Sequence, residues 1–211
     1  MKKYILFDND GVLVETEPWY YEATKNVLKD LDVILHEDVY LKLMAEGTTA
    51  WTLAEVQGIS EETIIQTRHK RNELYQHYIQ TKDIAIKGAK EVIEALSVKY
   101  KMGIVTTSRR VDFELIHHKG EITKFMDFVL CEEDYPRAKP YPDPYLKGLE
   151  LFKAIPDEAI VVEDSKRGLS AAVAAGIECV IVHNEFTQSH DFSDATHRIQ
   201  TLDALFHLLE R

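Results

Sequence analysis

The stretch YILFDNDGVL, residues 4–13, decides how this chain folds. Its first part, Tyr4 to Phe7, is a short apolar run that is typical of a buried strand. The run ends abruptly in two carboxylates, Asp8 and Asp10, and Gly11 follows them. Two like charges at the end of a buried strand raise the question of what offsets their repulsion.

Four similar apolar runs recur along the chain, and segments with a helical spacing of apolar residues lie between them. The runs cover residues 102–106, 128–131, 159–163 and 179–182. The helical segments cover residues 89–98, 144–152, 168–176 and 201–209, with Thr201 expected as the N-cap of the last. Strands that alternate with helices predict βαβ units, an α/β fold and a mostly parallel sheet.

Residues 15–86 break this alternation, because they contain no convincing strand pattern. Helical spacing starts at Pro18, which suits the first turn of a helix. Leu41, Leu43 and Met44 suggest another helix, and a longer helical pattern begins after Ser60, a predicted N-cap. We therefore expect residues 15–86 to form an all-helical block inserted after the first strand, and residues 1–14 and 87–211 to form the core.

The composition excludes several classes of partner. The chain has 211 residues and a formal net charge of −11 at pH 7, so we expect no nucleic acid and no membrane as partners. No apolar stretch approaches the ~20 residues that a membrane-spanning helix needs. Cys131 and Cys179 lie in apolar stretches without a CxxC spacing, which predicts reduced core residues in a cytoplasmic protein. The sequence leaves a monomer and a weak dimer both open.

Polar side chains follow each of the first four predicted strands. They are Asp8 and Asp10; Thr106, Thr107, Ser108, Arg109 and Arg110; Lys139; and Glu163, Asp164 and Ser165. Because ligands of a doubly wound sheet bind at the carboxyl ends of its strands, these residues are candidates for one site. Carboxylates, hydroxyls and an ammonium suit Mg²⁺ and a phosphoryl group. Each cluster alone could cap a helix or lie on the surface, but four strand ends with matching chemistry favour a shared site.

Four short motifs resemble those of the haloacid dehalogenase superfamily, in the order expected for that family. They are FDNDGVL, IVTTS, AKPYPDPY and VVEDSKRG, and the resemblance extends over nearly the whole chain. The helical insert between the first two motifs resembles the branch that contains phosphoglycolate phosphatase and β-phosphoglucomutase. The resemblance implies a Rossmann-like, doubly wound parallel sheet with an inserted α-helical cap domain at residues 15–86.

The resemblance also implies a role for the residues of each motif. Asp8 would be the nucleophile that forms an aspartyl-phosphate, and Asp10 would be the general acid and base. Thr106 would donate a hydrogen bond to a phosphoryl oxygen. Lys139 would neutralise charge on the aspartyl-phosphate and orient Asp8.

The implied cofactor is Mg²⁺, because a bound cation offsets the repulsion between a carboxylate and a phosphate. Asp8, Asp164 and the backbone carbonyl of Asp10 would hold the ion. Glu163 would ligate it directly or act through water. The implied substrate is a small phosphorylated metabolite.

Several further residues have two open interpretations. Thr107 and Ser108 are candidate substrate-binding residues, and Arg109 and Arg110 either hold a second anionic group of the substrate or lie on a helix surface. The aromatic residues of the insert either line the pocket or fill the core of the insert: Trp19, Tyr20, Tyr21 and Trp51. His117 and His118 lack a partner at metal-ligand spacing, and we expect them at the surface.

The sequence favours a Mg²⁺-dependent phosphatase, with a phosphosugar mutase as the alternative. Mutases of the resembling branch carry a cap arginine shortly after a glycine, where this chain has Ala50 in EGTTAWTL. They often carry a histidine soon after the first motif, where this chain has Tyr20 and Tyr21. A dehalogenase needs no metal and no proton donor at the second acid, and a non-catalytic binding protein does not need all four motifs.

Overall fold

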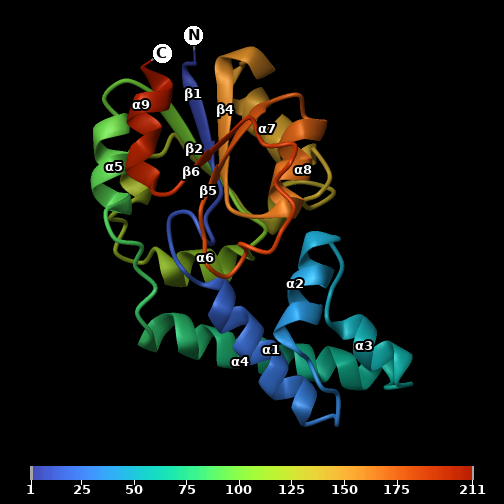
Figure 1. Cartoon of the computed structure of the whole chain (residues 1–211). Helices are drawn as coiled ribbons and strands as arrows, with labels where there is room; N and C mark the ends of the chain where they lie inside the picture. Colours follow the sequence, from blue (N-terminus) through green and yellow to red (C-terminus); the bar gives the residue numbers. More distant parts are fainter. Residues whose placement is uncertain (1, 211) are drawn as a thin grey trace.

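The computed structural model describes residues 2–210, and in that range it contains one sheet of six strands whose neighbours are all parallel. The strand order is β3-β2-β1-β4-β5-β6, as in a doubly wound sheet (Figure 1). The strands are β1 (Tyr4–Phe7), β2 (Lys101–Val105), β3 (Phe128–Leu130), β4 (Ala159–Glu163), β5 (Glu178–Val182) and β6 (His197–Ile199). The α/β fold with a Rossmann-like parallel sheet is thereby confirmed.

Strand β1 lies at the centre of the sheet, between β2 and β4. Its last residue, Phe7, is in register with Ile104 of β2 and Val162 of β4. The three strands therefore end at nearly the same level. The residues that follow them along the chain are brought to one edge of the sheet.

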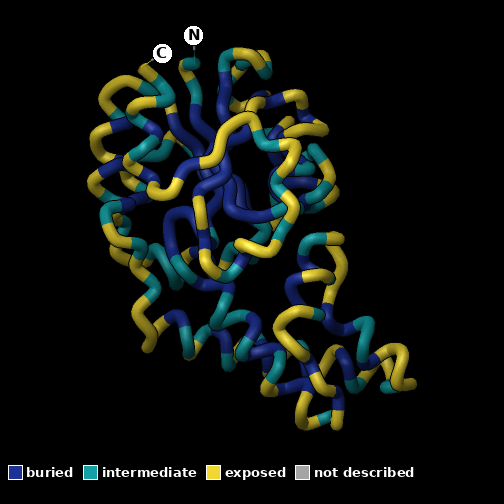
Figure 2. The backbone as a smooth tube through the Cα atoms, viewed as in Figure 1, coloured by how far each residue is buried: buried dark blue, intermediate teal, exposed yellow. Residues whose placement is uncertain are grey.

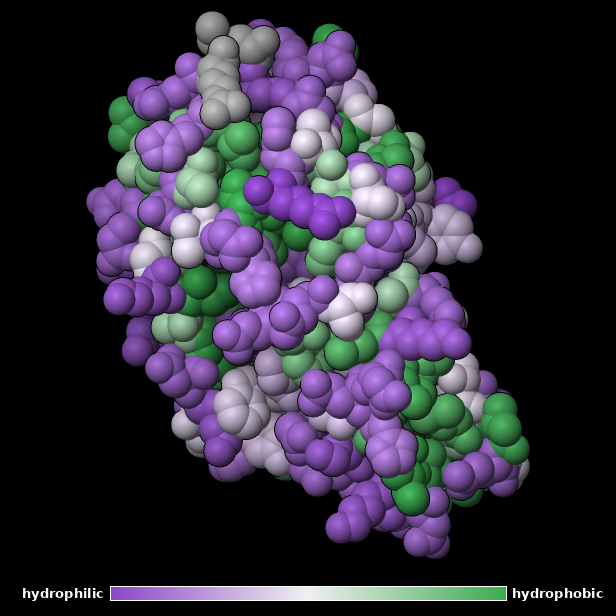
Figure 3. Space-filling model, viewed as in Figure 1, coloured by the Kyte–Doolittle hydropathy of each residue, from purple (hydrophilic) through white to green (hydrophobic). Residues whose placement is uncertain are grey.

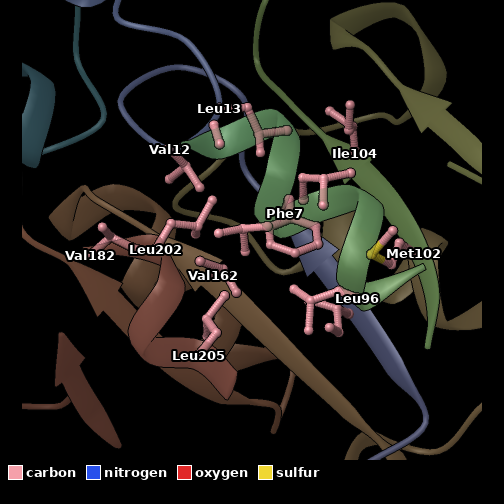
Figure 4. Close-up of a cluster of buried hydrophobic side chains, with 14 of the residues drawn as sticks. Phe7, Val12, Leu13, Leu96, Met102, Ile104, Val162, Val182, Leu202 and Leu205 are labelled. Atoms are coloured by element: carbon pink, nitrogen blue, oxygen red, sulfur yellow. The ribbon is translucent and has the colours of Figure 1, made fainter. Parts of the chain in front are cut away.

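Helices cover both faces of the sheet. Helices α5 (Ala89–Leu96) and α9 (Leu205–Leu209) lie on one face, and α7 (Asp143–Phe152) and α8 (Lys166–Ala174) lie on the other (Figure 1). Phe7 packs in the apolar cluster on the α5 and α9 side (Figure 4), whereas Leu6 belongs to the cluster on the α7 and α8 side. The sheet is buried on both faces (Figure 2), which explains why its strands are continuous apolar runs.

Most core boundaries lie within two residues of those expected from the sequence, and there are two differences. Strand β6 was not predicted, since His197 and Arg198 are exposed and only Ile199 of this strand is buried. The expected N-cap Thr201 makes no side-chain capping hydrogen bond, because a 3₁₀ turn precedes α9. The 3₁₀ turns are η1 (Thr123–Phe125), η2 (Glu132–Asp134), η3 (Pro156–Glu158) and η4 (Leu202–Ala204). Cys131 and Cys179 are free and buried, as expected for core residues.

Four helices form a separate layer beyond the carboxyl edge of the sheet (Figure 1). They are α1 (Glu17–Lys29), α2 (Glu37–Ala45), α3 (Trp51–Val56) and α4 (Glu61–Thr81), and we call them the helical block. Pro18 lies in the first turn of α1, and the side chain of Ser60 accepts a hydrogen bond from the Thr63 N–H at the start of α4, as predicted. The block has its own apolar cluster, which includes Tyr21, Leu28 and Trp51.

The chain enters and leaves the helical block at one place. Val14 and Ala85 form an antiparallel bridge, and the Glu15 N–H donates to the Ile84 carbonyl at 2.9 Å. Helix α6 (Arg110–Ile116) of the sheet layer contacts α4 of the block. These contacts place the block over the ends of β1 and β2.

The surface is mostly hydrophilic on the face shown in Figure 3, and apolar side chains gather there over α2 and α3. The largest exposed fraction among the large apolar residues, 88%, belongs to Val56 at the end of α3. Between residues 2 and 210, no helix combines the length and the apolar character that crossing a membrane requires.

Candidate active site

The two aspartates after β1 have different partners. Asp8 Oδ1 accepts a hydrogen bond from Lys139 Nζ at 2.8 Å. Asp10 Oδ2 instead accepts from the hydroxyls of Thr106 at 3.1 Å and Ser108 at 2.8 Å, and its Oδ1 accepts from Thr16. One carboxylate therefore lies against an ammonium group and the other among hydroxyl groups. Because their surroundings differ in charge, the two carboxylates can take different roles in a reaction.

Lys139 is held in place through its ammonium group. Its Nζ donates to Asp8 Oδ1 at 2.8 Å, to Glu163 Oε1 at 2.7 Å and to the Val105 carbonyl at 2.9 Å, which uses all three donors. Only 5% of the residue is exposed. Burial by itself would lower the pKa of Lys139, but the carboxylates of Asp8 and Glu163 hold that pKa above its ordinary value. The side chain is therefore charged.

Glu163, the last residue of β4, accepts hydrogen bonds on both oxygens. Its Oε1 accepts from Lys139 and from the Tyr145 hydroxyl at 2.7 Å. Its Oε2 accepts from the Asp164 N–H at 3.1 Å and from the N–H and hydroxyl of Ser165 at 3.2 and 3.0 Å. Burial raises the pKa of Glu163, but Lys139 and these hydrogen bonds outweigh it and keep that pKa below the usual range.

Asp8, Glu163 and Asp164 form a buried acidic cluster, with one oxygen of each within 4.8 Å of the others. Burial, followed by repulsion from Glu163, raises the pKa of Asp8 to about 7 and that of Asp164 well above its usual value. Within residues 2–210, no Lys, Arg or His nitrogen lies within 4.0 Å of the Asp164 carboxylate. The cluster is short of positive charge, and its hard oxygen donors suit Mg²⁺.

Gly11 makes room for the carboxylate of Asp164. A Cβ atom at Gly11 would lie 2.1 Å from Asp164 Oδ2, and the backbone there has a φ of +78°. The Thr187 hydroxyl is hydrogen-bonded to Asp164 on the other side, at 2.7 Å from its carbonyl oxygen. Asp164 is therefore fixed between the turn after β1 and the loop that contains Thr187.

A cavity of about 470 Å³ lies between this edge of the sheet and the helical block. Asp10, Ser108 and Lys139 line it from the sheet side. The helical block contributes mainly aromatic, small polar and basic side chains: Tyr20, Tyr40, Thr48, Thr49, Trp51, Arg68, Arg71, Asn72 and Tyr75. The cavity is large enough for a small metabolite.

The candidate substrate-binding residues differ in their placement. Thr107, Ser108 and Arg109 line the cavity. The guanidinium of Arg109 is bound by the Asp112 carboxylate through two hydrogen bonds of 2.7 and 2.8 Å. Arg110 is not a lining residue, and its guanidinium pairs with Asp134. For Arg110 the helix-surface interpretation describes the structure better.

The aromatic residues of the insert divide between the two expected uses. Tyr20 and Trp51 line the cavity. Tyr21 packs against Tyr40 in the core of the helical block, and Trp19 packs against Tyr78.

We expected both His117 and His118 at the surface, and the structure confirms this for His118 alone. His118 is exposed. His117 is half-buried, and its Nε2 lies 2.7 Å from Asn9 Oδ1, so the expectation of a surface residue was wrong there. A single histidine without a spacing partner carries no sequence signal for such a contact.

Four residues of the site were not identified from the sequence: Asn9, Thr16, Arg68 and Arg71. Asn9 lies within the first motif and Thr16 lies three residues after it, so proximity to the two aspartates was the available signal. Arg71 interrupts a stripe of buried residues on α4 that includes Ile64, Thr67 and Tyr75. A charged residue in such a stripe indicates a polar partner or a cavity.

Comparison with known proteins identifies relatives of this chain. The family model described as haloacid dehalogenase-like hydrolase matches residues 5–182. A phosphorylated carbohydrates phosphatase of Thermotoga maritima is 27% identical over 187 residues, covering 85% of each chain. The pyrophosphatase PpaX of Bacillus cereus is 26% identical over 180 residues, covering 84% of this chain and 82% of that protein.

The fold is also shared with a solved structure. CbbY from Rhodobacter sphaeroides, crystallised in complex with phosphate, superposes with a TM-score of 0.81 at 23% identity, covering 97% of this chain and 96% of that chain. Since the family model spans most of the sequence and includes all four motifs, this chain belongs to the haloacid dehalogenase-like hydrolase family.

Proposed function

We propose that this protein is a Mg²⁺-dependent phosphatase that hydrolyses a small phosphorylated metabolite through an aspartyl-phosphate. The observation that carries the proposal is the Asp8 carboxylate, which accepts a hydrogen bond from Lys139 at 2.8 Å and belongs to the acidic cluster. Asp10 lies two positions further along, and the partners of its carboxylate within residues 2–210 are hydroxyl groups. The phosphatase and pyrophosphatase names of the two relatives support the same reaction class.

Asp8, Asp164 and the backbone carbonyl of Asp10 would hold the magnesium ion. Bound there, Mg²⁺ would offset the charge of the phosphate that approaches the carboxylate. Glu163 is better suited to another role, because its oxygens already accept five hydrogen bonds. We assign Glu163 to holding Lys139 rather than to direct ligation.

Asp8 would act as the nucleophile. Its carboxylate oxygen forms a bond to phosphorus while the bond from phosphorus to the leaving oxygen breaks. Lys139 would neutralise charge on Asp8 and fix its orientation, and Thr106 would turn its hydroxyl proton from Asp10 to a phosphoryl oxygen. These groups are held by the sheet before substrate binds, so little reorganisation is needed.

Asp10 would transfer the protons. It gives a proton to the leaving oxygen, which leaves it as a carboxylate. It then takes a proton from the water that attacks phosphorus, and this attack breaks the bond to Asp8 and releases phosphate. Hydroxyl partners suit this role, because Thr16, Thr106 and Ser108 can rotate their protons as Asp10 changes its state.

We also propose that residues 15–86 act as a cap domain over a core of residues 1–14 and 87–211. Two observations support this division: the paired segments at Val14 and Ala85, and the cavity between the helical block and the sheet. Ala50 lines the cavity, and it lies in the stretch EGTTAWTL, which we match to the segment where mutases of the resembling branch carry an arginine. That feature supports hydrolysis over isomerisation.

The test is phosphate release from p-nitrophenyl phosphate and a panel of phosphorylated metabolites with Mg²⁺. We expect Asp8→Asn and EDTA each to abolish release, with added Mg²⁺ restoring the EDTA sample and the exposed-residue control Asp157→Asn remaining active. Activity in Asp8→Asn or in chelator would contradict the proposal. β-Glucose 1-phosphate belongs in the panel, since isomerisation without phosphate release would identify a mutase.

A further inference from the structure

The helical block contributes two arginines to the cavity that form no ion pair with any carboxylate within residues 2–210. Arg68 and Arg71 lie one turn apart on α4, and both line the cavity. Arg71 is only 7% exposed. Within residues 2–210, neither guanidinium has a carboxylate oxygen within 4.0 Å, whereas the other two lining arginines do: Arg109 pairs with Asp112 at 2.6 Å and Arg167 with Glu17 at 3.7 Å.

Both guanidinium groups also have buried donors without a partner. Arg68 Nε and Arg71 Nη1 are buried, and neither donates to any acceptor of the described residues. A buried charged donor without an acceptor is unfavourable, and two such donors at one cavity favour the binding of an anion there.

Aromatic rings hold these guanidinium groups in position. The Arg71 guanidinium carbon lies 4.1 Å from the centre of the Tyr20 ring, and its Nε donates to Asn72 Oδ1 at 2.9 Å. The Arg68 guanidinium carbon lies 5.5 Å from the centre of the Trp51 ring. These cation–π contacts help to position the two groups, and Arg68 Nε and Arg71 Nη1 are left without an acceptor.

Three of the four acidic residues that line the same cavity have other partners: Asp10, Glu17 and Asp112. Glu17 accepts from the Tyr40 hydroxyl and pairs with Arg167. Asp112 binds Arg109 and also accepts from Gln76 at 2.9 Å. Glu132 is exposed. Glu17 and Glu132 interact with Arg71 electrostatically but form no ion pair with it, so the guanidinium groups still have room for an anionic ligand.

We propose that Arg68 and Arg71 bind a second anionic group of the substrate, either a phosphate or a carboxylate. The substrate class is then a small phosphate monoester with a further anionic group at its other end. The inference rests on the proposed function, in which the reacting phosphate lies at Asp8 and Lys139. Because the arginines belong to the helical block, the second anion joins the block to the core and orients the reacting phosphate.

The experiment compares substrates in matched pairs that differ by one anionic group. Ribulose 5-phosphate against ribulose 1,5-bisphosphate tests a phosphate, and glycerol 3-phosphate against 3-phosphoglycerate tests a carboxylate. We expect the doubly anionic member of at least one pair to have the higher kcat/KM, and the pair that shows it identifies the group. Arg71→Gln should reduce that preference by about 10–100-fold, mainly through KM, as expected for a lost charged hydrogen bond.

Three further variants sharpen the result. Arg68→Gln should also reduce the preference. Arg71→Lys should recover part of it, because lysine keeps the positive charge but lacks the paired N–H donors of a guanidinium group. Lys70→Gln removes the same charge from the exposed side of α4 and should leave the preference unchanged. Equal kcat/KM within both pairs, or an equal loss for both members in Arg71→Gln, would overturn the inference while the phosphatase assignment stands.

Binding measurements separate this inference from the proposed function. Calorimetric titration of ribulose 1,5-bisphosphate and 3-phosphoglycerate into Asp8→Asn, with and without Arg71→Gln, reports binding without turnover. Binding of either compound that Arg71→Gln weakens supports the anion site even if no phosphate ester is hydrolysed. Binding of both that is unaffected by Arg71→Gln counts against the site, whatever the enzyme does in the activity assay.

Discussion

His117 Nε2 lies 2.7 Å from the side-chain oxygen of Asn9, the residue between the two aspartates. Asn9 is fully buried, and its backbone carbonyl accepts the N–H groups of Leu13 at 2.9 Å and Val14 at 3.1 Å. Burial lowers the pKa of His117 to about 4, so the ring is neutral at neutral pH and donates its Nε2 proton to Asn9. The end of α6 is thereby joined to the turn that positions both acids.

Removing this donor is expected to slow the reaction. In His117→Ala the side chain of Asn9 loses its partner and the turn loosens, and a displacement of catalytic groups by about 1 Å costs up to about 100-fold in kcat. We expect kcat to fall by about 10–100-fold. The neighbouring, exposed His118→Ala is the control, and a loss of similar size in both variants would argue against a specific role for the contact.

The same histidine predicts how stability depends on pH. The unfolded chain protonates this ring near 6.5, whereas the folded chain does so only near 4, so the unfolded state binds more protons between these values. The free energy of unfolding therefore falls as the pH is lowered through this window, by up to about 1.4 kcal/mol per pH unit from this group. Urea denaturation at a series of pH values should show a steeper loss in wild type than in His117→Ala. Parallel curves would contradict the pKa assignment.

Gly11→Ala is expected to damage the acidic cluster. The new Cβ would lie 2.1 Å from Asp164 Oδ2, so the carboxylate must move. Gly58→Ala is a close control, because its φ of +79° imposes the same backbone strain while no atom lies within 4 Å of the new Cβ. Both variants should lose about 1–2 kcal/mol of stability from the left-handed backbone. Only Gly11→Ala should need at least about tenfold more Mg²⁺ for half-maximal activity.

Gly168→Ala is expected to destabilise the protein although alanine favours helices. In an open helix position the change would contribute about 1 kcal/mol of stability. Here the added Cβ would lie 1.7 Å from Glu163 Oε1, which binds Lys139. Displacing Glu163 leaves Lys139 short of a partner, so we expect a lower melting temperature and a lower kcat. A stabilised, fully active variant would show that Glu163 does not need this contact.

Asp10→Asn is expected to lower kcat by about 10²–10⁴-fold, the usual contribution of general acid–base catalysis. An amide cannot give and take the proton, but its oxygen can still accept from Thr106 and Ser108, and so the fold should persist. The rate should be followed with p-nitrophenyl phosphate, with circular dichroism to check folding. An unchanged rate in a folded variant would remove the proton-transfer role.

The sheet and the motif residues could be predicted from the sequence because the patterns that indicate them lie within short stretches of the chain. Strand β1 is an apolar run with a polar end, and a parallel sheet carries whatever follows such runs to one edge. The contacts of Asp8 with Lys139 and of Asp10 with Thr106 agree with that expectation. Strand β6 was missed because three residues, of which only Ile199 is buried, give no pattern.

The residues that were missed depend on contacts between distant segments. Asn9 and His117 are 108 positions apart, and a lone half-buried histidine resembles a surface one in the sequence. The arginines on α4 can be identified as site residues only in the folded structure, where the helical block lies over the sheet and both arginines line the cavity. Periodicity identifies the helix but not the surface that it faces.

The bridge between Val14 and Ala85 has an evolutionary consequence. Since the chain departs and returns at neighbouring points, a different set of helices could be grafted there without shifting the strand ends that bear the reacting groups. The residues that carry out the reaction and the residues that select the substrate can thus diversify independently within one polypeptide.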